Sequence, residues 1–339
     1  MSHEMSHDRS AEPAADSAVE KILGFTGSLV AIVTPFNQDG GIDYGALSEL
    51  ISMHERNHTA GLFFLGVAGE GATLDDDEFK VFVRTVLGVP HTVPFLIGCT
   101  GNSTAGAVRR VRTAAAHGAD GVVLTVPANM GPDQDQAARY FLDIADSTAV
   151  PIGTFNNPAR LLTDLDTATL LRILEHPRIV LHKEGSPRTG QIAELLAHRP
   201  KVCFLADDSP DQDILVPALA RGAQGIANAA GNLLPREFAR LSRPWRNFQD
   251  LADFRELHDR LFPLIKFLYS HRSPTAIKSL MNAVGLPGGH LRAPLTSLTE
   301  DQVKTGMALL KEYAHASAES AQETSPLTGL PLLALPERS

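Results

Sequence analysis

Eight short apolar segments alternate with helix-length amphipathic segments between residues 25 and 233, and this alternation limits the possible folds more than any other feature. Each apolar segment has the length and composition of a buried parallel strand. The expected strands are residues 29–33, 61–65, 94–97, 121–126, 151–155, 179–183, 202–206 and 225–227. Eight consecutive strand–helix units predict an α/β protein with a (β/α)8 TIM barrel. An open doubly wound sheet is the alternative, but no Gly-x-Gly-x-x-Gly motif opens the first expected helix.

The segments on either side of these units differ from them in pattern. The first residues are polar, and a series of helical patterns follows the eighth expected strand. The resulting prediction is a disordered N-terminal extension over residues 1–24, the barrel over 25–233, a C-terminal helical domain over 234–316 and a tail over 317–339.

The composition excludes several classes of partner. A formal net charge of -9 argues against nucleic acid and anionic membranes, which select for basic surfaces. No apolar run approaches the length of a transmembrane helix, and the polar N-terminus does not resemble a signal peptide. Two widely separated cysteines, Cys99 and Cys203, provide neither a disulfide framework nor a metal cluster. We therefore expect a cytoplasmic protein without a bound metal.

Chemically active side chains in a barrel of this kind gather where the strands end, at their carboxyl termini. Lys183 ends the sixth expected strand, and Asp207 follows the seventh. Arg160 lies shortly after the fifth, and the glycine-rich residues 66–71 follow the second. A desolvated amine can attack a carbonyl carbon, exposed backbone amides can hold a carboxylate, and an arginine can bind a second anion. The combination predicts a pocket for a 2-oxo acid.

Each of these features has a simpler interpretation. The glycine-rich residues could form only a tight loop, and Arg160 could be a surface residue. Asp207 and Asp208 could only cap the next helix. His182 is expected to face outward against the helices, because side chains alternate along a strand, and is interpreted as a structural histidine.

The chain resembles the dihydrodipicolinate synthase / N-acetylneuraminate lyase family. The resemblance starts with FTGSLVAIVTPF at residues 25–36 and continues through Gly66-x-x-Gly-Glu70-x-Ala-Thr-Leu74. It also includes Asn156-x-Pro158-x-Arg160 and the strand that ends in Lys183-Glu184. It implies a barrel with a C-terminal helical domain, usually a homotetramer, with no cofactor. It further implies a Schiff base between Lys183 and pyruvate or a related 2-oxo acid, and Arg160 as the ligand for a distal carboxylate.

The sequence departs from the family pattern at the positions that move protons. The family's two threonines are replaced by Val67 and Ala68, and the relay tyrosine of a Pro-Tyr-Tyr motif is replaced by Asn129. The catalytic tyrosine of the Tyr-Asn-x-Pro motif is replaced by Phe155. General acid–base assistance contributes about 10²–10⁴-fold to a rate, so ordinary dihydrodipicolinate synthesis is not expected.

The favoured hypothesis is a Schiff-base lyase, aldolase, hydratase-aldolase or dehydratase that acts on pyruvate or another 2-oxo acid. Its proton transfers would use Glu70, Asn129 with a water, Asp207, Asp208 or the substrate's own carboxylate. The alternatives are a 2-oxo-acid-binding pseudoenzyme or sensor, and a different chemistry in which Lys183 is a base.

Lys183 is the expected catalytic residue, and the expected substrate-binding residues are Val67, Ala68, Asn129, Phe155, Arg160 and Asp207. The apolar replacements suggest a hydrophobic or aromatic aldehyde as the second substrate.

Overall fold

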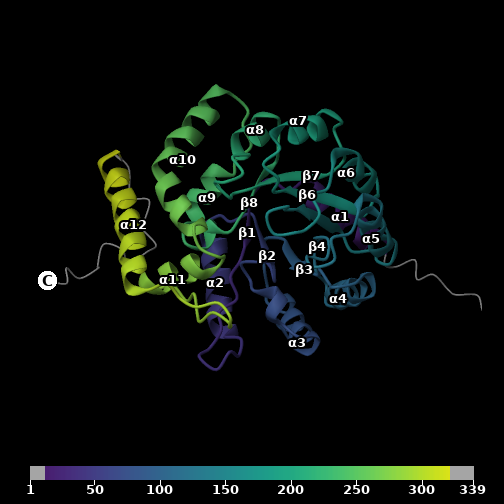
Figure 1. Ribbon diagram of the computed structural model, residues 1–339, viewed down its shortest axis with the longest axis horizontal. Helices are drawn as coiled ribbons and strands as arrows, with labels where there is room; N and C mark the ends of the chain where they lie inside the picture. The colour runs from purple at the N-terminus through teal and green to yellow at the C-terminus, as the bar shows by residue number, and fades with distance from the viewer. Residues whose placement is uncertain (1–11, 321–339) are drawn as a thin grey trace, which may run out of the picture.

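Eight parallel strands close into a barrel in which each strand pairs with the next and β8 pairs with β1 (Figure 1). The structure is a computed structural model, and it describes residues 12–320. The strands are β1 (Gly27–Ala31), β2 (Gly61–Phe64), β3 (Phe95–Gly98), β4 (Gly121–Leu124), β5 (Ile152–Asn156), β6 (Ile179–Glu184), β7 (Cys203–Asp207) and β8 (Gly225–Asn228). The closed barrel confirms the predicted fold class.

Helices connect the strands and surround the barrel. They are α2 (Tyr44–Arg56), α3 (Asp76–Leu87), α4 (Thr104–Ala116), α5 (Gln134–Asp146), α6 (Thr167–Leu174), α7 (Thr189–Ala197) and α8 (Leu215–Ala220), with the short 3-10 helices η1 (Gly71–Thr73) and η2 (Ala230–Asn232). Several of these helices begin at a capping aspartate. Asp75 and Asp133 each form a capping box, in which a side-chain oxygen accepts from the first-turn amides. Such caps fix where each strand-to-helix loop ends.

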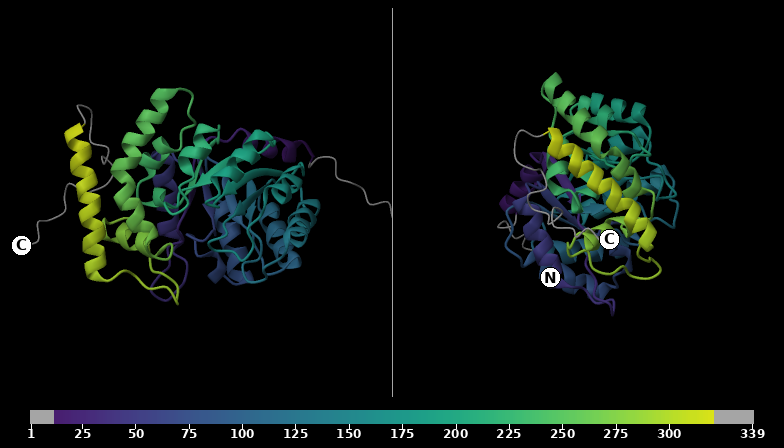
Figure 2. Two further views of the ribbon diagram at one scale, coloured as in Figure 1. Left: turned by 45° about the horizontal axis from the view of Figure 1, so that its top comes forward. Right: turned by 90° about the vertical axis from the view of Figure 1, so that its left-hand side faces the viewer.

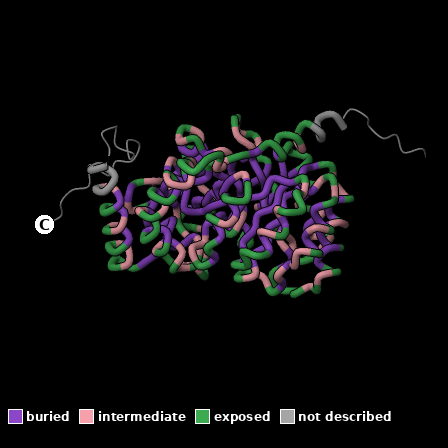
Figure 3. The backbone as a smooth tube through the Cα atoms, turned by 90° about the horizontal axis from the view of Figure 1, so that it is seen from above, coloured by how far each residue is buried: buried purple, intermediate pink, exposed green. Residues whose placement is uncertain are grey.

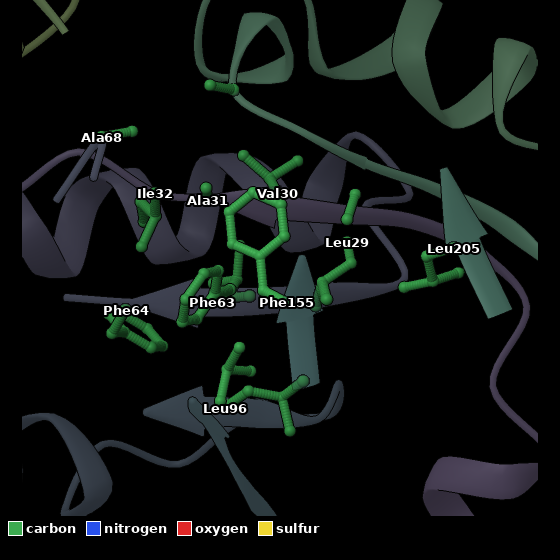
Figure 4. Packing of buried hydrophobic residues seen from close by; sticks show 14 of the residues in the cluster. Leu29, Val30, Ala31, Ile32, Phe63, Phe64, Ala68, Leu96, Phe155 and Leu205 are labelled. Carbon is green, nitrogen blue, oxygen red and sulfur yellow. The ribbon is translucent and has the colours of Figure 1, made fainter. Parts of the chain in front are cut away.

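The core fills the barrel and the layer between the strands and the helices. Nearly every strand residue is buried on both faces, which explains why the strands appear in the sequence as continuous apolar runs (Figure 3). The ring of Phe155 lies inside the barrel near Phe63 (Figure 4). Phe155 is therefore part of the interior packing as well as of the barrel's carboxyl-terminal end.

The C-terminal helices form a separate layer against one side of the barrel (Figure 2). They are α9 (Pro235–Leu241), α10 (Phe248–Tyr269), α11 (Thr275–Ala283) and α12 (Glu300–Ser320). Helices α10, α11 and α12 pack against one another. Helix α12 extends four residues beyond the predicted end of the helical domain at residue 316, and the rest of the predicted tail, 321–339, lies outside the described residues.

A helix occupies half of the segment that was predicted to be disordered. Helix α1 (Glu12–Leu23) lies beside β6, and Ile22 is only 2% exposed. Lys21 pairs with Asp120 at 2.6 Å. The prediction of disorder over residues 1–24 is therefore wrong for 12–23, because a few apolar side chains in a polar segment find a place in the core. Residues 1–11 lie outside the described part.

Across residues 12–320, no helix combines the length and the apolar character that a membrane crossing would require.

Candidate active site

A cavity of about 790 Å³ opens at the carboxyl ends of the strands. Residues from the loops after several strands line it, and so does the end of α10 from the C-terminal helical layer. The lining contains every residue that the sequence predicted for the site, namely Lys183, Val67, Ala68, Asn129, Phe155, Arg160 and Asp207. The structure therefore brings the predicted residues together around one cavity.

Lys183 lies at the end of β6 and is 6% exposed. Its Nζ atom is 2.7 Å from Oδ1 of Asp207 and 4.3 Å from the centre of the Phe155 ring. Phe155 is the register partner of Lys183 on β5, which explains why the ring and the amine meet. The amine thus has one carboxylate and one aromatic face as neighbours, in a site largely shielded from water.

Asp207 is held in place by a second contact. It ends β7, and its Oδ2 accepts a hydrogen bond from Nε2 of Gln212 at 3.1 Å. One oxygen of the carboxylate is thus engaged by an amide, while the other faces the amine. This arrangement orients Asp207 to accept or return a proton of Lys183.

The side chains that alternate with Lys183 form a polar network on the outer face of the sheet. His182 is fully buried, with Nδ1 2.8 Å from Oγ1 of Thr154 and Nε2 3.2 Å from Oε2 of Glu184. Glu184 also accepts from the side-chain amide of Asn156 and from the amides of Gly185 and Ser186. His182 therefore has the structural role predicted for it, and the network fixes the ends of β5 and β6.

The glycine-rich residues after β2 form a tight turn beside the cavity. A Cβ atom at Gly71 would lie 2.0 Å from the Leu65 carbonyl oxygen, so no other residue fits there. Val67 and Ala68 line the cavity, and within the described residues their backbone amides donate to no protein acceptor. Two free amides at the cavity wall suit a carboxylate ligand.

Glu70, in the same turn, is already paired. Its side chain is buried, its backbone is left-handed (φ 51°), and Oε1 accepts from Nζ of Lys278 at 2.8 Å. Its Oε2 accepts from the backbone amide of Arg292 at 2.9 Å. Both oxygens bind groups of the C-terminal layer, so Glu70 joins that layer to the active-site turn.

Arg160 and Asn129 lie at the exposed side of the cavity. Both side chains are exposed, and neither has a hydrogen-bond or ion-pair partner within the described residues. Arg160 follows β5 and its backbone amide donates to the carbonyl of Asn157. An unpaired guanidinium at the mouth of a cavity is available to an anionic group of a ligand.

Asp207 and Asp208 do not cap the following helix, as the simpler interpretation proposed. The capping residue of α8 is Ile214, and no side chain caps that helix. Asp208 instead accepts hydrogen bonds from the backbone amides of Ala229 and Ala230 after β8, and from the phenol of Tyr269. The β7 loop therefore connects the floor of the site to α10.

Sequence reasoning missed several cavity residues, and two of them contact the aspartates that follow each other at the end of β7. Gln212 lies in a polar loop and carries no recognisable motif, although its place five residues after Asp207 was a weak signal. Tyr269 ends α10, and its helical spacing predicts only that one face of the helix is buried. No group of three or more potential metal ligands occurs in the part of the chain that the structure describes.

The chain is similar to proteins of one family over most of the residues that the structure describes. The pattern of the Dihydrodipicolinate synthetase family matches residues 24–313. A 4-hydroxy-tetrahydrodipicolinate synthase of Neisseria gonorrhoeae is 37% identical over 285 residues, which cover 84% of this chain and 97% of that protein.

Solved structures show the same relationship. The 4-hydroxy-tetrahydrodipicolinate synthase from Methylacidiphilum fumariolicum aligns with a TM-score of 0.80 and 31% identity over 87% of this chain and 97% of that one. A monomeric dihydrodipicolinate synthase variant aligns with a TM-score of 0.79 and 27% identity over 86% and 97% of the two chains. The chain therefore belongs to the dihydrodipicolinate synthetase family, whose members are class I lyases that form a lysine Schiff base.

Proposed function

We propose that Lys183 forms a Schiff base with pyruvate or a related 2-oxo acid, and that the enzyme then makes or breaks a carbon–carbon or carbon–oxygen bond next to the imine. The observation that carries the proposal is the buried amine at the cavity, 2.7 Å from Asp207. A protonated imine withdraws electrons from the neighbouring carbon, so that carbon can lose a proton and act as a nucleophile.

The proton balance of imine formation defines what the site must supply. The Lys183 ammonium first gives a proton to Asp207, which lies within hydrogen-bonding distance. The free amine then forms the C–N bond, and the former carbonyl oxygen leaves as water while the nitrogen keeps one proton. The ammonium loses two protons in total and the departing water gains two. A group near the oxygen is therefore needed to carry protons from the nitrogen side to the oxygen side.

The turn after β2 is the proposed site of the 2-oxo acid's carboxylate. The backbone amides of Val67 and Ala68 are the candidate donors, because they have no protein acceptor within the described residues. Peptide amides bind a carboxylate without the threonine hydroxyls of the related enzymes. The replacement of both threonines therefore leaves carboxylate binding possible and removes hydroxyl groups from the proton path.

The second substrate is proposed to be a hydrophobic or aromatic aldehyde, and ordinary dihydrodipicolinate synthesis is proposed to be slow. Support comes from Phe155, where the related enzymes carry a phenol, and from Val67, which is 45% exposed beside the cavity. A cavity of about 790 Å³ also exceeds what pyruvate alone requires. Arg160 at its mouth suits a second acidic group on such an aldehyde.

Borohydride trapping tests the proposal directly. The purified protein is incubated with pyruvate, then with other 2-oxo acids, reduced with borohydride, and digested for peptide mass analysis. The expected result is a stable adduct on the Lys183 peptide, absent from Lys183→Arg. Failure to trap any 2-oxo acid on Lys183 refutes the proposal. An adduct without turnover of any aldehyde or hydroxy acid instead supports the binding protein considered as the alternative.

A homo-oligomer, most often a tetramer in this family, is the proposed assembly, and the cytoplasm is the proposed location. Family membership supports the assembly, although one structural relative is described as a monomeric variant. Light scattering coupled to gel filtration measures the molar mass, and a monomer at micromolar concentration rules the oligomer out.

A further inference from the structure

Tyr269 brings a phenol to the active-site cavity from outside the barrel. It is the last residue of α10 and lines the cavity together with Lys183 and Asp207. The sequence contains four tyrosines, and Tyr269 is the only one among them that lines this cavity. Phe155 occupies the position where the resemblance places the family's phenol, so the phenol at this cavity comes from α10 and not from a barrel strand.

Asp208 holds this phenol. The hydroxyl of Tyr269 donates a short hydrogen bond to Oδ1 of Asp208, and the carboxylate also accepts from the backbone amides of Ala229 at 3.2 Å and Ala230 at 3.3 Å. Asp208 is 2% exposed and follows Asp207, the partner of Lys183. The two adjacent aspartates therefore connect the amine on one side with the phenol on the other.

The electrostatics of the site determine which form each member of the pair takes near neutral pH. Burial, followed by the charge of Asp207, raises the pKa of Asp208 to about 7, although the positive charge of Lys183 opposes this shift. Burial and the nearby charges of Asp208 and Asp207 raise the pKa of Tyr269 well above its usual value. The phenol is thus protonated at neutral pH, while the carboxyl group that it contacts exchanges a proton readily.

We propose that Tyr269 is a catalytic acid–base residue that, together with Asp208, carries protons for the Schiff-base chemistry of Lys183. The inference rests on the proposed function, because it requires an imine to be formed at that lysine. It assigns a replacement for the missing phenol to a helix of the C-terminal layer and not to a barrel strand.

The step starts from the protonated form of Asp208, in which the carboxyl group donates the shared hydrogen bond to the phenol oxygen and the phenol proton is free for the substrate. As the C–O bond of the carbinolamine breaks, the phenol gives its proton to the departing oxygen, which leaves as water. The phenolate takes the proton of the Asp208 carboxyl group, and the backbone amides of Ala229 and Ala230 stabilise the carboxylate that results. The pair returns to its starting state when Asp208 takes up a proton equivalent to one released by the Lys183 nitrogen. No oxidant, metal or second reactant is required.

Other hydroxyl groups at the cavity are poorer candidates. The hydroxyls of Thr100 and Thr125 lie 3.3 Å apart, and that of Thr125 also donates to a backbone carbonyl. Aliphatic hydroxyls are much weaker acids than phenols, and within residues 12–320 neither threonine hydroxyl hydrogen-bonds to a carboxyl group. Glu70 is already paired through both oxygens.

Tyr269→Phe tests the assignment, with Tyr140→Phe as the matched control. Tyr140 is a buried phenol on α5 that does not line the cavity. With pyruvate as the probe, Tyr269→Phe is expected to slow the approach to the borohydride-trapped adduct by about 10²-fold or more. The final adduct yield on Lys183 and the pyruvate concentration for half-maximal trapping should change little. The control variant should keep the wild-type rate.

The pH profile and a rescue variant separate catalysis from structure. The wild-type trapping rate should fall as the pH rises through about 7, because Asp208 then loses the proton that it transfers. In Asp208→Asn the trapping rate should no longer show this fall. Introducing Phe155→Tyr into Tyr269→Phe should recover part of the rate, because it returns a phenol beside Lys183.

The outcomes also separate the two proposals. If no 2-oxo acid is trapped on wild-type Lys183, the proposed function fails, and this inference fails with it. If the wild-type protein is trapped normally and Tyr269→Phe has the same rate and pH profile, only the assignment of Tyr269 is overturned. A loss in Tyr269→Phe that Phe155→Tyr does not restore, accompanied by a lowered melting temperature, also overturns it in favour of a structural role.

Discussion

The Nζ atom of Lys183 lies 4.3 Å from the centre of the Phe155 ring, and the two residues are register partners on adjacent strands. An aromatic face attracts an ammonium ion by about 0.5–2 kcal/mol, depending on how far it is desolvated. The same ring can neither donate nor accept a proton. Phe155 therefore helps to hold the amine in the site but leaves its proton transfers to other groups.

Phe155→Tyr should increase aldol turnover of pyruvate by about 10-fold or more, since it places a phenolic acid near the carbinolamine. The measurement is steady-state turnover, including the 4-hydroxy-tetrahydrodipicolinate synthase reaction of the relatives. Phe63→Tyr is the matched control, because Phe63 lines the same cavity and is equally buried at 6% exposure. An equal gain from both variants, or none from Phe155→Tyr, would contradict a specific role for the missing hydroxyl.

Arg160→Ala should weaken the use of aldehydes that carry a second acidic group. A charge-assisted hydrogen bond contributes about 1.5–3 kcal/mol, so kcat/KM should fall about 10- to 100-fold for acidic aldehydes and by less than about 3-fold for neutral ones. Arg109→Ala is the control, because Arg109 is also exposed and lines the cavity. If the two variants lose activity equally for both classes of aldehyde, only the total charge of the cavity matters.

The sequence was sufficient to predict the barrel and the lysine, for a physical reason. Parallel strands buried on both faces produce continuous apolar runs, and polar residues directly after such runs lie at one end of the barrel. Lys183 and Asp207 were therefore found from local pattern, whereas Phe155 was singled out by the family resemblance.

Contacts over long sequence distances could not be found in the same way. Tyr269 meets Asp208 across 61 residues, and its helix shows only the spacing of a half-buried surface. The pairing depends on how the C-terminal layer packs against the barrel. Helix α1 was missed for a related reason, since Ile22 becomes buried only when the completed barrel provides a surface for it.

Lys278→Met should destabilise the protein by about 3–5 kcal/mol, because it leaves the buried Glu70 side chain without its ion-pair partner. Lys278 is 1% exposed and donates to the Thr34 carbonyl, to Glu70 and to the His290 carbonyl, so it joins α11 to the active-site turn. The free energy of unfolding, measured by urea denaturation, checks this cost.

Two further variants test the cause of that cost. Lys80→Met removes an exposed lysine paired with Asp77 and should cost less than about 1 kcal/mol. Adding Glu70→Gln to Lys278→Met should recover part of the stability, since it removes the unpaired charge. If the double variant is no more stable than Lys278→Met, the cost comes from lost packing and not from the buried charge.

His54 should make stability depend on pH, and the direction follows from its burial. The side chain is fully buried on α2 with Nδ1 3.0 Å from Oγ1 of Thr59, and burial lowers the pKa of His54 to about 4. Between about pH 6.5 and 4 the unfolded chain binds a proton that the folded protein does not, so acidification favours unfolding. The loss should be about 1.4 kcal/mol per pH unit, or about 3 kcal/mol across the window.

The raised pKa of Asp208 acts in the opposite direction over much of the same range, because there the folded protein binds the extra proton. The wild-type profile alone therefore understates the effect of His54, and the quantity to measure is the difference in unfolding free energy between the wild type and His54→Gln at each pH. The unfolding free energy of the wild type, relative to that of His54→Gln, should fall as the pH is lowered from 6.5 to 4. His198→Gln, at an exposed histidine after α7, provides the matched control. A difference that stays constant across the window would mean that His54 takes up its proton equally in the folded and unfolded states.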